Sequence, residues 1–149
     1  MKLFDVRSII LAKHAQHVVL IHFPIALCLT GIGFDLLAQF RSNKVLAEVA
    51  YYNLLVAAFS TVPVVATGLL AWQFQLEGQR LKGTLLLHLV LAIVGSIMIW
   101  IVFSFHWRAR RKPQSQLSGY RILAELVAVT IVALAAHLGG ILSGVNAPL

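Results

Sequence analysis

Charge and cysteine are both scarce in this sequence. Of its 149 residues, 12 are basic and 5 are acidic, while 60% are hydrophobic. Soluble domains are about half apolar, so the composition excludes an ordinary water-soluble domain. The single cysteine, Cys28, excludes an intrachain disulfide and a C-x-x-C-H motif for covalent haem attachment. Because Cys28 lies inside an apolar run, we predict that it packs in the interior.

The first residues lack the features of a cleavable secretory signal. Residues 1–16 mix charged and apolar side chains at short spacing, whereas a signal has a continuous apolar stretch and a small-residue cleavage site. The mixed pattern predicts an amphipathic segment at the membrane surface over residues 1–16. We expect a single membrane domain over residues 17–149.

Apolar runs of membrane-spanning length are abundant. Runs of about 20 residues cross the hydrocarbon core as helices, and lipid offers backbone amides no other partners. Four such runs cover residues 18–38, 49–72, 83–105 and 122–142. Short connections favour antiparallel neighbours. The sequence therefore predicts an all-α, integral membrane, up-down four-helix bundle.

Lysine and arginine in the connections predict the orientation, since cytoplasmic loops are enriched in both. Seven lie on one side of the membrane and five on the other. The larger group is Arg41, Lys44, Arg108, Arg110, Arg111, Lys112 and Arg121, and the smaller is Lys2, Arg7, Lys13, Arg80 and Lys82. We therefore expect a multi-pass protein of the bacterial inner membrane with both termini in the periplasm. The short basic stretches reflect topology, so no nucleic-acid partner is expected.

Three histidines lie in the apolar runs near the same face of the membrane. His22 and His88 are near the starts of the first and third spans, and His137 is near the end of the fourth. All three therefore approach the outer face, and His14 and His17 precede the first span on that side. An ionisable side chain inside a membrane is costly, so it indicates a functional site. Three at one level suggest a shared ligand.

Haem b iron fits this pattern, because imidazoles from facing helices commonly hold haem in membrane bundles. The first and third helices of an up-down bundle are diagonal, so we predict His22 and His88 as the axial pair. His137 is an alternative ligand. Arg80 and Lys82 lie in an outer connection, where they would neutralise the haem propionates.

Small residues support a flat ligand at this level. They include Ala92, Gly95, Ala133 and Gly140 in the third and fourth spans. His22 and His88 both stand in an H-x-x-x-A setting, which hints at two helical hairpins related by a pseudo-twofold axis. Thr67 and Gly68 in the second span indicate close helix packing.

Two other interpretations of the histidines stay open. Imidazole also suits zinc and copper, although Glu77 is the one carboxylate near the outer level. Alternatively, the histidines form structural hydrogen bonds between helices.

The opposite level holds a second group, Asp35, His106 and Glu125. His106 follows His88 by 18 residues, five helical turns, so both project from one face of the third helix. With one histidine there, a second bis-histidine haem is not expected. These three residues form a possible proton or quinone site.

Asp35 also has a structural interpretation. It would then pair with Arg41 or accept a hydrogen bond from Tyr51, Tyr52 or Asn53.

The segment HVVLIHFPIALCLTGIGFDLL, residues 17–37, resembles the opening span of a family of small four-helix bacterial membrane proteins known as domain of unknown function 2231. Members show a histidine followed by Phe-Pro and an aspartate about a dozen residues later. Here these residues are His22, Phe23, Pro24 and Asp35.

The rest of the chain continues the resemblance. Residues 51–72 are similar to the family's second span, His88 falls at its third-span histidine, and Gly139 and Gly140 at its closing glycine pair. His137 is not carried over from a family position, so the resemblance gives it no role. Similar domains accompany c-type haem domains, and the resemblance therefore implies electron transfer.

We accordingly predict a haem b-binding electron-transfer subunit rather than a complete enzyme. It would relay electrons between quinone or a membrane partner and a periplasmic redox partner, such as a c-type cytochrome or a dehydrogenase. One alternative is a non-redox accessory subunit of a larger membrane complex. Another is a membrane metal-binding or transport protein.

Overall fold

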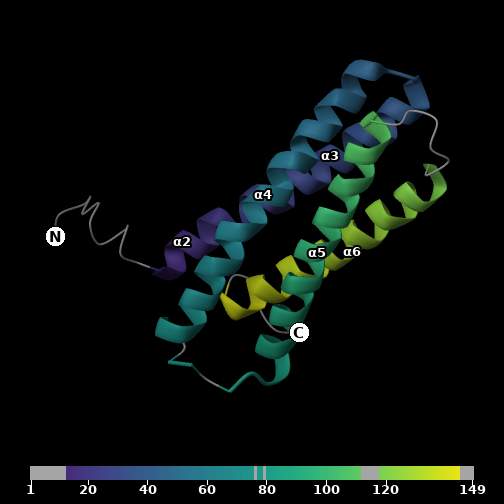
Figure 1. The fold of residues 1–149 in the computed structure, drawn as a ribbon. Helices are drawn as coiled ribbons and strands as arrows, with labels where there is room; N and C mark the ends of the chain where they lie inside the picture. The colour runs from purple at the N-terminus through teal and green to yellow at the C-terminus, as the bar shows by residue number, and fades with distance from the viewer. Residues whose placement is uncertain (1–12, 76, 79, 112–117, 145–149) are drawn as a thin grey trace, which may run out of the picture.

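Five helices make up the computed structural model, which describes residues 13–75, 77–78, 80–111 and 118–144 (Figure 1). They are α2 (Lys13–Leu20), α3 (His22–Arg41), α4 (Lys44–Gln75), α5 (Gly83–Arg111) and α6 (Ser118–Leu142). None of the described residues forms a strand. The predicted all-α membrane bundle is confirmed.

Four segments are long and apolar enough to cross a membrane: Gln16–Arg41, Lys44–Phe74, Gly83–Arg111 and Gly119–Leu142. Each contains one of the four runs identified in the sequence. The protein is therefore a multi-pass membrane protein. Most of the predicted interfacial segment, residues 1–12, lies outside the described residues, and α2 begins at Lys13.

The first span bends between α2 and α3 because of Pro24. A proline ring inside a helix clashes with the carbonyl four residues earlier, here that of Leu20. Ile21 nevertheless keeps helical dihedrals, with φ −60° and ψ −26°. Its N–H donates to the His17 carbonyl oxygen at 3.0 Å, so α2 and α3 form one bent membrane span.

The helices pack as two hairpins. α3 and α2 both contact α4, and α5 contacts α6, while α4–α5 and α3–α6 contacts join the hairpins. We call the end with the turn at Ser42 and Asn43 the hairpin end, and the end where α2 begins and α4 leads to α5 the terminal end (Figure 1). This contact pattern places α3 and α5 diagonally, as predicted.

Small side chains let the helices approach in the middle of the bundle and toward the hairpin end. Packing of small residues drives helix association in lipid. A Cβ added at Gly31 would lie 2.9 Å from Cγ of Leu54, which shows how close α3 and α4 come. The buried core consists of Cys28, Ile32, Leu54, Ala57, Ala58, Ile99, Val102, Ala128 and Val132. Cys28 is fully buried, as expected.

A repeat of 71 residues relates the two hairpins. Subtracting 71 from the bounds of α5, 83 and 111, gives 12 and 40, nearly the bounds of the α2–α3 span. Buried positions follow the same offset. The matched buried pairs are Pro24 and Gly95, Cys28 and Ile99, Gly31 and Val102, Asp35 and His106, Leu54 and Glu125, Ala57 and Ala128, and Thr61 and Val132.

The helix contacts obey the same relation. Exchanging α3 with α5 and α4 with α6 converts the contacts within one hairpin into those within the other, and α4–α5 into α6–α3. The hairpins are therefore related by a pseudo-twofold axis. Its register differs from that suggested by the two H-x-x-x-A segments, because the repeat matches His88 with His17 and not with His22.

Candidate functional site

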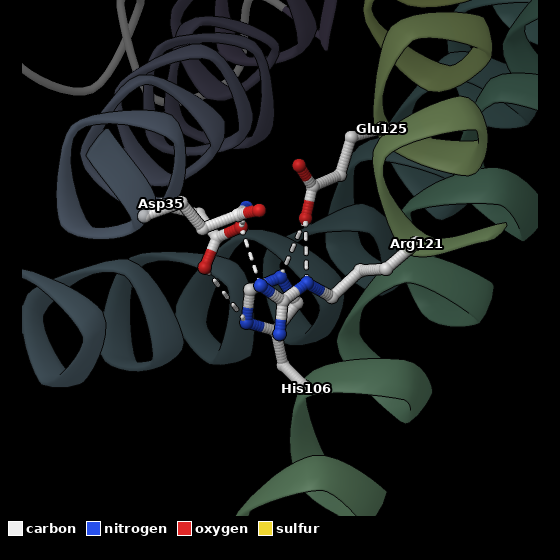
Figure 2. Close-up of polar contacts among 5 residues, drawn as sticks. Asp35, His106, Arg121 and Glu125 are labelled. Atoms are coloured by element: carbon white, nitrogen blue, oxygen red, sulfur yellow. Dashed lines mark hydrogen bonds and ion pairs between the residues drawn. The ribbon is translucent and has the colours of Figure 1, made fainter. Parts of the chain in front are cut away.

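Four charged or ionisable side chains converge near the hairpin end of the bundle (Figure 2). α3 supplies Asp35, α5 supplies His106, and α6 supplies Arg121 and Glu125. Asp35, His106 and Glu125 are 2%, 6% and 0% exposed. We refer to these four residues as the polar cluster. Because both hairpins contribute to it, the cluster depends on how they pack together.

His106 lies between the two carboxylates. Its Nε2 is 2.8 Å from Oε1 of Glu125, and its Nδ1 is 3.9 Å from Oδ1 of Asp35. The first distance is that of a hydrogen bond, and the second is longer than one. His106 therefore bonds to Glu125 within its own hairpin and faces Asp35 across the pseudo-twofold axis.

Arg121 lies against the same two carboxylates. Its Nη2 is 3.1 Å from Oδ2 of Asp35, and its Nε is 3.8 Å from Oε1 of Glu125. Residues four apart share a helix face, which explains why Arg121 and Glu125 point into the same space. Gln39, four residues after Asp35, donates a hydrogen bond to Oδ2 of Asp35.

One carboxylate oxygen of the polar cluster accepts no hydrogen bond from the described residues. Among the described residues, Oε2 of Glu125 is buried and has no hydrogen-bond partner. Such atoms are rare in folded proteins, because leaving a buried acceptor unsatisfied is costly. A proton on Oε2 would convert this acceptor into a carboxylic acid hydroxyl.

The negative and positive charges of the polar cluster do not balance when the two carboxylates and the guanidinium are counted as ions. Two carboxylates face one guanidinium, so the cluster carries one negative charge if His106 is neutral. One added proton, on His106 or on a carboxylate, makes the cluster neutral. Burying a net charge costs far more than burying a neutral group.

The same residues offer three ligand atoms to a metal ion. Atoms of Asp35, His106 and Glu125 lie within 4.8 Å of one another. The Arg121 guanidinium, however, already contacts both carboxylates. A divalent cation would have to displace this positive charge or tolerate its repulsion. The arrangement thus suits a proton better than a metal.

The proton or quinone role of Asp35 stays a prediction, but the structure shows which side chains it contacts. It brings Asp35 together with His106 and Glu125 instead of placing it against Arg41. Asn53 uses its side chain elsewhere, donating to the Val49 carbonyl oxygen at 2.8 Å. Sequence reasoning missed Arg121, which it treated only as a topological charge. The four-residue spacing of Arg121 and Glu125, which places both side chains on one helix face, was the signal in the sequence.

In the part of the chain that the structure describes, the histidines near the terminal end form no group of three potential metal ligands. Among the described residues, Asp35, His106 and Glu125 form the one group of three or more potential ligands close enough for an ion. His22 is exposed, and its Nδ1 lies 2.7 Å from the Val18 carbonyl oxygen in its own helix. His137 is also exposed. The axial pair His22 and His88 stays a prediction.

His88 makes a contact between helices. Its Nδ1 donates to the Ala135 carbonyl oxygen of α6 at 3.0 Å. Its ring lies over Gly139, where an added Cβ would be 3.0 Å from Cε1. Arg80 and Lys82 are exposed in the connection between α4 and α5, at the same end of the bundle.

His17 was given no ligand role by the sequence analysis. Its ring packs on Gly68 of α4, where an added Cβ would lie 2.9 Å from Cε1. Its Nδ1 is 3.2 Å from Oγ1 of Thr67. Thr67 and Gly68 were predicted to mark close packing, and the structure identifies His17 as the side chain that packs there.

The family described as "Predicted membrane protein (DUF2231)" matches residues 13–146. Comparison with curated proteins gives no match, and comparison with solved structures gives none.

Proposed function

The chain belongs to the DUF2231 family of predicted membrane proteins, and we propose that it is a redox subunit that handles one proton for a membrane quinone. One observation carries this proposal: three acid–base side chains are buried against a single guanidinium inside membrane-spanning helices. Ionisable groups inside membrane spans mark proton relays and ligand sites.

The charge balance explains how the cluster would work. With one proton the cluster is neutral, and without it the cluster carries one buried negative charge. The proton is therefore held firmly until a nearby charge changes. A quinone bound beside the cluster would acquire such a charge when a membrane redox partner reduces it by one electron, and the cluster would then supply a proton to it.

The proton has two positions that keep the cluster neutral. On His106 it gives an imidazolium ion bonded to Glu125, at 2.8 Å, and facing Asp35. On Glu125 it occupies Oε2, the buried atom that has no other partner among the described residues. Transfer along the hydrogen bond from Nε2 of His106 would put the proton on Oε1 of Glu125, and rotation of the carboxyl group would then bring it to the Oε2 side.

The position of the cluster fits uptake from one side. Glu125 is six residues from Gly119, where its span begins, which is a depth of about 9 Å. Arg121 has a side chain that is 18% exposed, so it forms the boundary between the buried carboxylates and the hairpin end. Protons would enter past this side chain.

Basic and aromatic residues favour a cytoplasmic hairpin end. The Arg110 guanidinium lies over the rings of Tyr51 and Tyr52, and that of Arg111 lies over Trp107. Aromatic belts mark membrane interfaces, and basic residues favour the cytoplasmic side. We therefore propose that the termini are periplasmic in a bacterial inner membrane.

Infrared difference spectroscopy tests the proton proposal. The protein is reconstituted in vesicles with a short-chain ubiquinone analogue, which is reduced electrochemically. We expect bands of Glu125 or His106 to change on reduction, and to be lost in Glu125→Gln and His106→Gln. Glu48→Gln is the matched control, because Glu48 is exposed and pairs with Arg110. A spectrum independent of both cluster residues contradicts the proposal.

A second candidate function is electron transfer through haem b near the terminal end. The hydrogen bond from His88 Nδ1–H to the Ala135 carbonyl oxygen favours it. Metal-ligating histidines usually donate one ring N–H to such an acceptor, which orients the ring and leaves the other nitrogen for the metal. Bound haem would supply one-electron chemistry, with other membrane subunits and a c-type cytochrome or dehydrogenase as partners.

The visible spectrum of the purified protein tests this function. A Soret band and a b-type α band on reduction support haem binding. A colourless preparation from haem-replete cells contradicts it and favours an accessory subunit. Stoichiometric zinc or copper in such a preparation favours a metal-binding or transport protein.

A further inference from the structure

We propose that the outward face of α5 binds one anionic phospholipid, in the membrane leaflet at the hairpin end. The site is an open groove of about 370 Å³ on this helix. Its lining consists of Ile97, Trp100, Ile101, Ser104, Phe105 and Arg108. Residues three or four apart share a helix face, so the lining is one continuous strip of α5 that ends at Arg108.

The groove is separate from the polar cluster. His106 follows Ser104 by two residues, which is about 200° around the helix, so the two side chains point in nearly opposite directions. His106 is buried between the hairpins, whereas Ile97 and Arg108 are exposed. The groove therefore opens toward lipid, and a ligand bound there is independent of the proton chemistry proposed above.

The side chains that form the groove are held in place by the protein itself. The Trp100 Nε1–H donates to Oγ1 of Thr61 in α4 at 3.1 Å, and its ring meets that of Phe59 edge-on with centroids 5.1 Å apart. The Ser104 hydroxyl donates to the Trp100 carbonyl oxygen at 2.7 Å. Because these polar groups already have partners, the body of the groove asks for an apolar occupant, such as an acyl chain.

The length of the groove matches one leaflet of a bilayer. Ile97 is the middle residue of α5, which runs from Gly83 to Arg111. From Ile97 to Arg108 the helix rises about 16 Å, close to half of a hydrocarbon core of about 30 Å. A membrane-spanning helix of a partner would need a complementary face through both leaflets. A groove confined to one leaflet fits a single lipid better.

Positive charge at the end of the groove favours an anionic headgroup. Within the described ranges, Arg108 forms no ion pair. The other arginines of α5 are engaged, because Arg110 pairs with Glu48 and Arg111 lies over Trp107. Arg111 adds a second positive charge one turn beyond Arg108. Guanidinium groups form charge-assisted hydrogen bonds with phosphate, and basic residues at the end of a span attract anionic lipids.

Fluorescence quenching by brominated lipids tests the site. Trp72→Phe and Trp107→Phe leave Trp100 as the sole tryptophan, with a ring retained beneath Arg111. Trp100 lies about 12 Å below Arg108 along the helix, at the depth of a mid-chain bromine. This parent protein is placed in phosphatidylcholine vesicles that contain a small fraction of mid-chain-brominated phosphatidylglycerol or phosphatidylcholine. We expect phosphatidylglycerol to bind about fivefold more strongly, as one basic residue near the surface provides.

Three variants of the parent protein locate the lipid. Arg108→Gln and its matched control Arg110→Gln each remove one positive charge from the same end of α5, so they weaken general attraction to an anionic surface equally. Only Arg108 lines the groove. We expect Arg108→Gln to lose the preference for phosphatidylglycerol and Arg110→Gln to keep it. Ser104→Phe fills the groove and should reduce quenching by brominated phosphatidylglycerol.

Four outcomes would overturn the proposal. The first is equal quenching of the parent protein by the two brominated lipids. The second is a preference for phosphatidylglycerol that persists in Arg108→Gln. The third is equal loss of the preference in Arg110→Gln, which would mean attraction by diffuse charge. The fourth is quenching that Ser104→Phe leaves unchanged, which would place the acyl chain outside the groove. A monodisperse elution profile in detergent shows that each variant folds.

Discussion

Asp35 and His106 occupy equivalent positions of the two hairpins and face each other with Oδ1 and Nδ1 3.9 Å apart. One position holds an acid and the other a base, so the pseudo-twofold axis passes between unlike groups. Glu125 and Arg121 break the symmetry further, because their counterparts in the first hairpin are Leu54 and Ala50. The chemistry of the cluster therefore comes from the departure of one hairpin from the other.

Replacing Arg121 should destabilise the protein strongly. Arg121→Met removes the positive charge that, within the described part of the chain, pairs with both buried carboxylates, and breaking a buried ion pair costs about 3–5 kcal/mol. Thermal unfolding in detergent measures the loss. Arg110→Met is the control, because its pair with Glu48 is exposed and worth about 0–1 kcal/mol.

A double variant separates charge from packing in that experiment. Arg121→Met combined with Asp35→Asn removes one charge of each sign and again leaves a cluster that one proton makes neutral. We expect it to recover much of the stability lost by Arg121→Met alone. If the double variant is as unstable as the single one, the guanidinium acts through its volume and not through its charge.

The proton count of the cluster should appear in the net charge of the protein. If the wild-type cluster is neutral and holds one proton, Glu125→Gln removes one carboxylate and releases that proton. The cluster therefore stays neutral in this variant. The isoelectric position in a non-ionic detergent should therefore stay unchanged. Glu48→Gln removes an exposed carboxylate and should shift the protein by one positive charge. Equal shifts for the two variants would mean that the wild-type cluster carries a buried negative charge.

Adding a methyl group under each imidazole should disturb the terminal end. In Gly68→Ala and Gly139→Ala the new Cβ meets the ring of His17 or His88, and overpacking of this kind typically costs about 1–3 kcal/mol. Gly33→Ala is the matched control, since nothing lies within 4 Å of its Cβ position. Because alanine favours helix over glycine, the control should unfold at the same or a higher temperature.

The hairpins should assemble when they are made as separate chains. A break at Glu77 and Gly78 falls in the connection between α4 and α5, outside both helices. We expect each fragment to form its own hairpin and the buried core to join the two. Co-expressed fragments should copurify through a tag on one of them. Replacing Ala57 and Ala128 by leucine should weaken this association by crowding the contact, and copurification unaffected by both changes would contradict the packing.

The levels of the side chains along the membrane could be predicted, because hydropathy locates the spans and the helical rise fixes depth. That is why Asp35, His106 and Glu125 were grouped before their contacts were known. The direction in which a side chain points around its helix depends on packing between helices. Arg121 therefore looked like a loop charge, although it bends inward to two carboxylates.

The repeat was only half visible in the sequence. Equivalent positions of the two hairpins are alike in burial much more than in residue type. The H-x-x-x-A pattern shared by His22 and His88 therefore suggested the wrong register. Gly68 and Gly139 are 71 residues apart and therefore follow the correct register. Their meaning depends on the histidine rings that lie against them, and these contacts became known only from the structure.

Covalent connection of the hairpins has a consequence for evolution. In a homodimer of one hairpin, both sides of the axis must present the same residue, so two acids or two imidazoles would face each other where Asp35 and His106 lie. Fusion of duplicated halves removes this restriction. An unlike acid and base can then share a symmetric centre, and each half is able to mutate there independently.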